Sequence, residues 1–175
     1  SMMMKMLEAG GIPPVTDNLR TADEDNPKGY YEFERVKQLT KGDIEWLADA
    51  PGKVVKVIAA LLPYLPATYR YRVVFMQRDM TEVLASQRQM LIRRGEDPNK
   101  IPDEIISKLF EKHLRQVNEW VAQQSNVERL DVNYNEMLKN PAPFIAQINA
   151  FLGGNLDIAQ MAQVVDPSLH RQRKE

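Results

Sequence analysis

Short apolar runs alternate with longer amphipathic stretches along this chain. The apolar runs at residues 73–76 (VVFM) and 53–58 (KVVKVI) are rich in β-branched side chains and predict two buried strands. Residues 127–132 (VERLDV) alternate as a strand near a sheet edge would. Amphipathic stretches predict helices at residues 1–9, 33–39, 43–50, 79–95, 102–124, 141–152 and 157–165. Strands that alternate with helices favour a three-layer α/β domain with a mainly parallel central sheet.

The strand at residues 73–76 and the helix after it form the central unit of the chain. Asp79 is a good N-cap, Glu82 completes a capping-box spacing, and Gly95 ends the helix. One face of this helix is traced by Val83, Leu84, Gln87, Met90 and Leu91. Arg78 therefore stands at the carboxyl end of a strand, against a helix N-terminus, where α/β sheets bind anions.

Ser86 lies seven residues after the cap, about two turns along and roughly on the same face. Together, Arg78 and Ser86 could bind one phosphate. The alternative is a buried strand followed by an amphipathic helix that carries a surface arginine.

The other predicted helices carry caps and core faces of their own. The first, at residues 1–9, has methionines around most of its circumference, which is typical of a buried helix, and Gly10 and Gly11 end it. Asp43 and Asp157 are expected to cap two short helices. The long helix at residues 102–124 should pack through a stripe of apolar residues, with His113 packed or hydrogen-bonded at its border: Ile105, Ile106, Leu109, Phe110, Leu114, Val117, Trp120 and Val121.

The composition of the chain argues against several kinds of partner and site. The 175 residues suit one domain, and 43% hydrophobic with 27% charged residues is ordinary for a globular protein. A net charge of −1 gives no reason to expect nucleic acid or an anionic membrane as partner. There is no cysteine and there are only two histidines, so we expect neither disulfides nor a metal site, and a cytoplasmic location.

Two segments resemble the cofactor-binding motifs of one enzyme family. The arrangement R-D-x-x-x-V-x-x-S, from Arg78 to Ser86, resembles the 3′-phosphate-binding motif of sulfotransferases that use 3′-phosphoadenosine 5′-phosphosulfate (PAPS). Residues 134–141 resemble the Y-E-[DE]-[LM]-x-x-x-P motif of the same family, with Asn135 in place of the usual Glu. The resemblance implies a sulfotransferase-like P-loop fold in which Tyr134 contacts the adenine.

The same resemblance implies catalytic and substrate residues. Residues 53–63 resemble the family's I-I-K-T-H-L-P segment, so Lys56 would steady the transferring sulfuryl group, but Ile58 stands where the family has its catalytic histidine. The segment at residues 26–32 resembles N-P-[KR]-G-[YF]-[YFW]-E. This makes Glu32 the candidate general base, Lys28 a candidate sulfate or substrate contact and Tyr30 a candidate substrate contact. In the tail, Arg171 or Arg173 would return to the 3′-phosphate.

The start of the chain also fits this family. Ser1 matches the last position of the phosphate loop P-[RK]-S-G-T-[ST], and the strand and loop that would precede it are missing from the sequence. We therefore expect a single domain, residues 1–175, truncated at its amino terminus, that is weak or inactive as an enzyme and prone to association. The alternative is that the match of Ser1 is accidental. A strand from another copy could complete the sheet in a homodimer.

The sequence thus predicts sulfuryl transfer from PAPS, without a metal, to a small-molecule or glycan acceptor. Two alternatives remain open. One is a non-catalytic nucleotide-binding or interaction scaffold of the same fold, and the other is a small-molecule kinase, which would need Mg²⁺ carboxylates near the phosphates.

Overall fold

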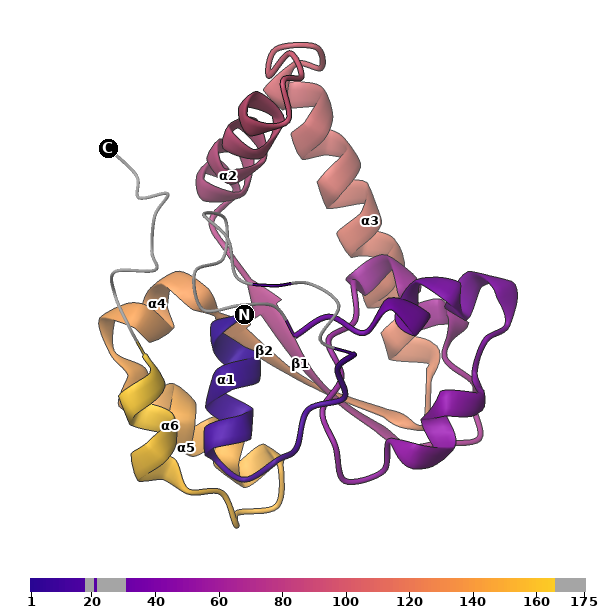
Figure 1. The fold of residues 1–175 in the computed structure, drawn as a ribbon, viewed down its shortest axis with the longest axis vertical. Helices are drawn as coiled ribbons and strands as arrows, with labels where there is room; N and C mark the ends of the chain where they lie inside the picture. The colour runs from indigo at the N-terminus through magenta and orange to yellow at the C-terminus, as the bar shows by residue number, and fades with distance from the viewer. Residues whose placement is uncertain (18–20, 22–30, 166–175) are drawn as a thin grey trace.

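The computed structural model describes residues 1–17, 21 and 31–165. The described chain is mainly helical, with two strands among the helices (Figure 1). The elements in chain order are α1 (Met2–Ala9), the 3₁₀ helices η1 (Glu34–Lys41), η2 (Glu45–Asp49) and η3 (Ala59–Tyr64), β1 (Tyr71–Gln77), α2 (Met80–Arg93), α3 (Asp103–Gln123), β2 (Val127–Asn133), α4 (Tyr134–Lys139), α5 (Pro141–Phe151) and α6 (Ile158–Val164).

Strands β1 and β2 pair in parallel, in a register that runs from Tyr71 opposite Val127 to Gln77 opposite Asn133. Helices α2 and α3 form the crossover between them, which parallel pairing requires. The mixed α/β class and the two strands are confirmed. In the part of the chain that the structure describes, however, the sheet has two strands.

The prediction of a buried strand at residues 53–58 was wrong. Val54 makes one isolated parallel bridge, to Pro14, and Ile58 is 62% exposed. The neighbouring segment contains Pro13 and Pro14, which lack backbone N–H groups. Since a ladder needs a donor at alternate positions, we attribute the single bridge to these two prolines.

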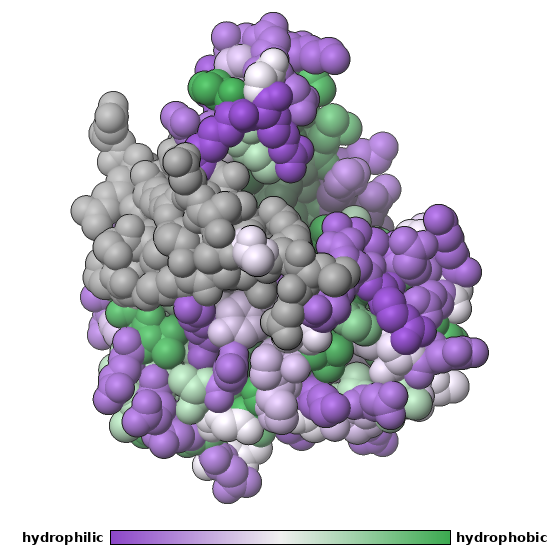
Figure 2. Space-filling model, in the orientation of Figure 1, coloured by the Kyte–Doolittle hydropathy of each residue, from purple (hydrophilic) through white to green (hydrophobic). Residues whose placement is uncertain are grey.

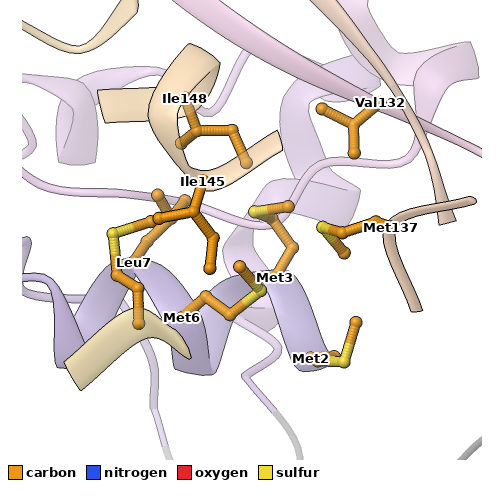
Figure 3. Close-up of a cluster of buried hydrophobic side chains, with 9 residues drawn as sticks. Met2, Met3, Met6, Leu7, Val132, Met137, Ile145 and Ile148 are labelled. Carbon is orange, nitrogen blue, oxygen red and sulfur yellow. The ribbon is translucent and has the colours of Figure 1, made fainter. Parts of the chain in front are cut away.

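The largest core cluster forms between α1, β2 and the helices α4, α5 and α6 (Figure 3). Its buried members are Met2, Met3, Met6, Leu7, Val132, Met137, Ile145, Ile148 and Met161. Figure 3 shows side chains of α1 pointing toward Ile145 and Ile148 of α5 and Val132 of β2. The predicted burial of the methionine-rich helix is therefore confirmed.

The helix that completes this cluster, α6, begins as the sequence predicts. The Asp157 carboxylate accepts a hydrogen bond from Gln160 N at 3.1 Å, and so caps the helix. Helix α6 crosses α1 closely at Gly10. A Cβ atom at Gly10 would lie 3.0 Å from both Cγ and Sδ of Met161, so close packing rather than backbone freedom favours glycine here.

Two smaller clusters of buried side chains complete the core. The first joins η1 and η2 through Val36, Leu39, Trp46 and Leu47, and the second joins Leu62, Phe75 and Val117 beneath α3. The prediction that Asp43 caps the helix at residues 43–50 was wrong. The cap position is Ile44, and Arg35 instead donates two hydrogen bonds to Asp43, at 2.9 and 2.6 Å.

Helices α2 and α3 form an antiparallel projection, here called the helical arm, that points away from the rest of the molecule (Figure 1). Within the arm, α2 buries only Glu82 and α3 buries only Val117. The predicted apolar face of α2 is half-buried, much of the predicted core stripe of α3 is exposed, and His113 is exposed. The core stripe is thus confirmed for the carboxyl half of α3, where Val117 is buried and Leu114, Trp120 and Val121 pack beside it. It was wrong for the amino half, because periodicity identifies an apolar face but not the element that covers it.

No helix in the described ranges combines the length and apolar character needed to cross a bilayer.

Candidate functional site

The carboxyl ends of the two strands bring Arg78 and Tyr134 together. Gln77 and Asn133 are the last pair of the parallel register, so the next residue of each strand leaves the sheet at the same edge. The Arg78 Cζ atom lies 5.1 Å from the centre of the Tyr134 ring, which is a cation–π contact. Arg78 and Tyr134 belong to two separate sequence motifs, both of which were expected to bind PAPS, and the fold makes them neighbours.

A buried carboxylate adjoins this pair. Glu82 is 3% exposed, and its Oε2 atom lies 3.6 Å from Nη2 of Arg78, which is 34% exposed. Burial raises the pKa of the Tyr134 phenol because it disfavours the phenolate; Arg78 opposes this rise and Glu82 adds to it. The three side chains therefore share one electrostatic environment.

Asn135 connects the two strand ends. It is buried, and its Oδ1 atom accepts a hydrogen bond from Asp79 N at 3.1 Å. Asn135 thus links the start of α4 to the start of α2. Asp79 occupies the predicted cap position of α2, although its side chain makes no capping hydrogen bond.

Sequence reasoning missed Glu82 and Asn135 as parts of this site. Glu82 was assigned to a capping box, but an arginine four residues before it would have suggested an ion pair. For Asn135, no local signal indicated its partner, because Asp79 lies far away in the sequence.

Ser86 makes no hydrogen bond to Arg78 among the described residues. It lies in α2 and is half-buried. That Arg78 and Ser86 bind one phosphate together stays a prediction.

The two predicted catalytic residues, Glu32 and Lys56, do meet. Lys56 Nζ lies 3.6 Å from Glu32 Oε1, and both side chains are partly exposed. The backbone around Glu32 is held by its neighbours: Thr16 Oγ1 donates to the Glu32 carbonyl at 3.2 Å, and Glu34 N donates to Asp17 Oδ2 at 2.6 Å. A partly exposed carboxylate on a fixed backbone can accept a proton.

Tyr31 ties the same segment to α1. Burial, followed by a hydrogen bond to Glu8, raises the pKa of the Tyr31 phenol well above its usual value. Glu32 is therefore positioned by contacts on both sides of it in the sequence.

The N-terminus of α1 lies near Lys56 and Lys5, and it contributes the positive end of the helix dipole rather than a charged amino group. Burial lowers the pKa of the Ser1 amino group to about 6, with Lys56 and Lys5 as further causes and Glu32 in opposition. The Ser1 hydroxyl caps the helix by accepting a hydrogen bond from Met4 N at 3.4 Å. Two lysines and a helix N-terminus so close together favour an anion.

The two groups of residues border a common core cluster. Met2 and Met3 of α1 belong to the largest cluster, and Tyr134 and Met76 pack against it. The amino end of α1 therefore lies on the same core as the carboxyl ends of the strands, which is the edge where α/β sheets bind ligands.

A hollow of about 270 Å³ opens beside the segment that carries Glu32. Aromatic, aliphatic and charged side chains line it: Pro14, Val15, Thr16, Phe33, Arg35, Trp46, Asp49 and Lys53. Phe33 and Trp46 meet edge to face, with ring centres 5.3 Å apart. This hollow is large enough for a small organic group.

Four predicted contact residues lie outside the described residues: Lys28, Tyr30, Arg171 and Arg173. Among residues 1–17, 21 and 31–165, no group of three or more His, Cys, Asp or Glu side chains is arranged to hold a metal ion.

No protein-family model, curated protein or solved structure matches this chain.

Proposed function

We propose that this chain is a sulfotransferase-like domain that binds PAPS and transfers its sulfuryl group to a hydroxyl or amine of a small-molecule or glycan acceptor. One observation carries the proposal: Arg78 and Tyr134, which come from two separate motifs, lie in contact at the carboxyl ends of adjacent parallel strands. The three-layer fold of that family is part of the proposal.

The residues at the strand ends fit the nucleotide part of PAPS. Arg78 is partly exposed and is held by Glu82 and Tyr134, so its guanidinium can donate charge-assisted hydrogen bonds to the 3′-phosphate. Ser86 would add a hydroxyl donor to the same phosphate. Tyr134 offers an aromatic ring to the adenine.

The residues near α1 fit the reacting end. When bound, PAPS supplies an activated sulfuryl group. Lys56 would stabilise negative charge on the sulfuryl oxygens, with the capped N-terminus of α1 at Ser1 as a second source of positive potential. Glu32, 3.6 Å from Lys56, would take the proton of the acceptor.

The hollow beside the Glu32 segment is the candidate binding site for the acceptor. The hollow lined by Phe33, Trp46 and Lys53 adjoins the Glu32 segment and offers an aromatic wall with polar groups. Such a lining suits an organic acceptor that carries hydroxyl or amino groups.

The test is calorimetric titration of the chain with adenosine 3′,5′-bisphosphate and with AMP. We expect the bisphosphate to bind more tightly, and Arg78→Ala to abolish the preference. A charge-assisted hydrogen bond contributes about 1.5–3 kcal/mol, so the loss of one or two should weaken binding from tenfold to a few thousandfold. Circular dichroism of each variant checks that it remains folded.

Arg72→Ala is the matched control. Arg72 lies at the opposite end of β1 and pairs with the exposed Glu128 at 3.6 Å, so its removal should leave the bisphosphate affinity unchanged. Equal binding of AMP and the bisphosphate would contradict a 3′-phosphate site. Specific binding without sulfuryl transfer to any acceptor would favour the scaffold alternative.

A further inference from the structure

Two buried polar side chains lie at the carboxyl ends of the strands. Hydrophilic side chains cover much of the surface in Figure 2, with smaller hydrophobic areas between them. A polar group at the surface needs no special explanation, whereas a buried one does. Among the described residues, the buried polar or charged side chains are Glu82, 3% exposed, and Asn135, 6% exposed. Both adjoin the contact between Arg78 and Tyr134, because Glu82 pairs with Arg78 and Asn135 follows Tyr134 in the chain.

The hydrogen bond of Asn135 joins the two strand ends beyond the sheet. Its Oδ1 atom accepts from Asp79 N at 3.1 Å, across 56 residues of sequence. The parallel register ends one residue before Arg78 and Tyr134, so the strand pairing itself does not hold these two residues. The donor directly follows Arg78 and the acceptor directly follows Tyr134. This one bond therefore ties together the backbone next to both side chains.

Two contacts to one rigid ligand act together only when the distance between them is fixed. A variable spacing has to be ordered at the moment of binding, and that cost lowers the affinity. We propose that Asn135 is a positioning residue: through its bond to Asp79, it holds Arg78 and Tyr134 at the spacing that a 3′-phosphorylated adenine nucleotide requires. This inference rests on the proposed function, in which Arg78 binds the 3′-phosphate and Tyr134 binds the adenine. Asn135 acts through these two residues and touches no ligand itself.

Glu82 has a different effect on the same contact. Its carboxylate lies 3.6 Å from the guanidinium of Arg78, only four residues away in the sequence, so it orients the Arg78 side chain within one segment. The bond of Asn135 instead connects two segments that are distant in the sequence. Loss of Glu82 frees the guanidinium but leaves the two backbones tied, whereas loss of Asn135 releases the spacing between them.

The test compares the affinities for adenosine 3′,5′-bisphosphate and for AMP by calorimetry. Asn135→Ala should reduce the preference for the bisphosphate roughly tenfold, because a changed spacing harms only the ligand that uses both contacts. The double variant with Arg78→Ala should show the same preference as Arg78→Ala alone, since Asn135 acts through Arg78. A role in stability alone would weaken both ligands equally and leave the ratio of their affinities unchanged.

Asp79 supplies a matched pair of variants that leaves Asn135 in place. Asp79→Ala keeps the backbone N–H, whereas Asp79→Pro removes it, and the φ of −58° at this position suits proline. We expect Asp79→Pro to lower the preference as Asn135→Ala does, and Asp79→Ala to retain it. Asn149→Ala is the control elsewhere in the fold: Asn149 Oδ1 accepts from Leu156 N at 2.9 Å, so this variant loses the same kind of bond outside the candidate site.

A measurement without ligand separates this inference from the proposed function. Because the Arg78 side chain lies over the Tyr134 ring, the ring current should shift the resonances of the Arg78 δ-methylene protons upfield. Tyr134→Leu should abolish this shift. Asn135→Ala should reduce it, and NMR spectra of the free chain give the comparison.

The outcomes distinguish the two proposals. A wild-type chain without preference for the bisphosphate would contradict the proposed function, and the NMR comparison then decides by itself whether Asn135 positions Arg78. An unchanged ratio of affinities in Asn135→Ala, equal preferences in Asp79→Pro and Asp79→Ala, or an unchanged Arg78 resonance in Asn135→Ala would each overturn the inference. Far-UV circular dichroism checks the folding of every variant, and the Asp79 pair gives the answer where Asn135→Ala does not fold.

Discussion

At the scale of single residues, the ion pair between Arg78 and Glu82 shows how burial decides the effect of a charge. Glu82 is almost fully buried, whereas Arg78 keeps a third of its side chain in solvent. The carboxylate therefore depends on the guanidinium more than the guanidinium depends on the carboxylate. Removal of a partner is costly when it leaves a buried charge poorly compensated.

This asymmetry gives a stability prediction. Arg78→Ala should lower the free energy of unfolding by about 1–3 kcal/mol, and Glu82→Gln should lower it by less than about 1 kcal/mol, since Arg78 can turn to water. The double variant should be more stable than Arg78→Ala alone. Urea unfolding followed by circular dichroism measures all three, and a Glu82→Gln variant less stable than Arg78→Ala would contradict the argument.

At the scale of elements, helix ends depend on individual caps. Asn133 caps α4 through Glu136 N at 3.0 Å, and Asp157 caps α6 through Gln160 N at 3.1 Å. Helix α6 spans only Ile158–Val164, yet it supplies the fully buried Met161 to the main core. A short helix that carries a core residue should be sensitive to the loss of its cap.

The cap of α6 can be tested with a matched pair of variants. Asp157→Ala should cost about 1 kcal/mol of stability because it removes the hydrogen-bond acceptor, and Asp157→Asn should cost less than about 0.5 kcal/mol because asparagine caps almost equally well. Thermal and urea unfolding of both variants give the comparison. Equal losses would show that the charge of Asp157, rather than its capping bond, matters.

At the scale of the whole molecule, three clusters of buried side chains surround a small parallel sheet. Tyrosines connect these clusters to the segments around them. Tyr71, at the start of β1, donates a hydrogen bond to the Pro66 carbonyl at 2.7 Å, and burial raises the pKa of its phenol to about 12. The pKa values of Tyr31 and Tyr134 are also raised, mainly by burial.

Stability should therefore fall in alkali. A phenol whose pKa is higher in the folded state than in the unfolded chain, near 10, stabilises the fold below pH 10, and this contribution is lost as the pH rises toward the folded value. We expect absorbance at 295 nm to show only part of the six tyrosines ionising near pH 10, and the rest ionising above about pH 11 together with the loss of ellipticity. Tyr71→Phe should remove one late-ionising group. Ionisation of all six near pH 10 with ellipticity intact would contradict this prediction.

Much of the local structure could be predicted from the sequence. The methionine-rich α1, strands β1 and β2, the long α3 and the proline-initiated α5 all follow from periodicity and from terminal signals within each segment. The candidate site was predictable in part, because Arg78 and Tyr134 each follow a strand that could be recognised. Their contact also required the parallel register of β1 and β2, which pairs Gln77 with Asn133.

By itself, then, the sequence determined where most of the helices and the strands β1 and β2 form, since those depend on neighbouring residues. Tertiary structure alone decided which faces are covered. Leu109 and Val117 lie in the same predicted stripe, yet the first is exposed and the second is buried, because Leu62 and Phe75 cover only one end of α3. The segment at residues 53–58 has the composition of a strand, but its described pairing is one bridge to Pro14. Burial and strand pairing depend on partners far away in the sequence, and a local pattern carries no record of them.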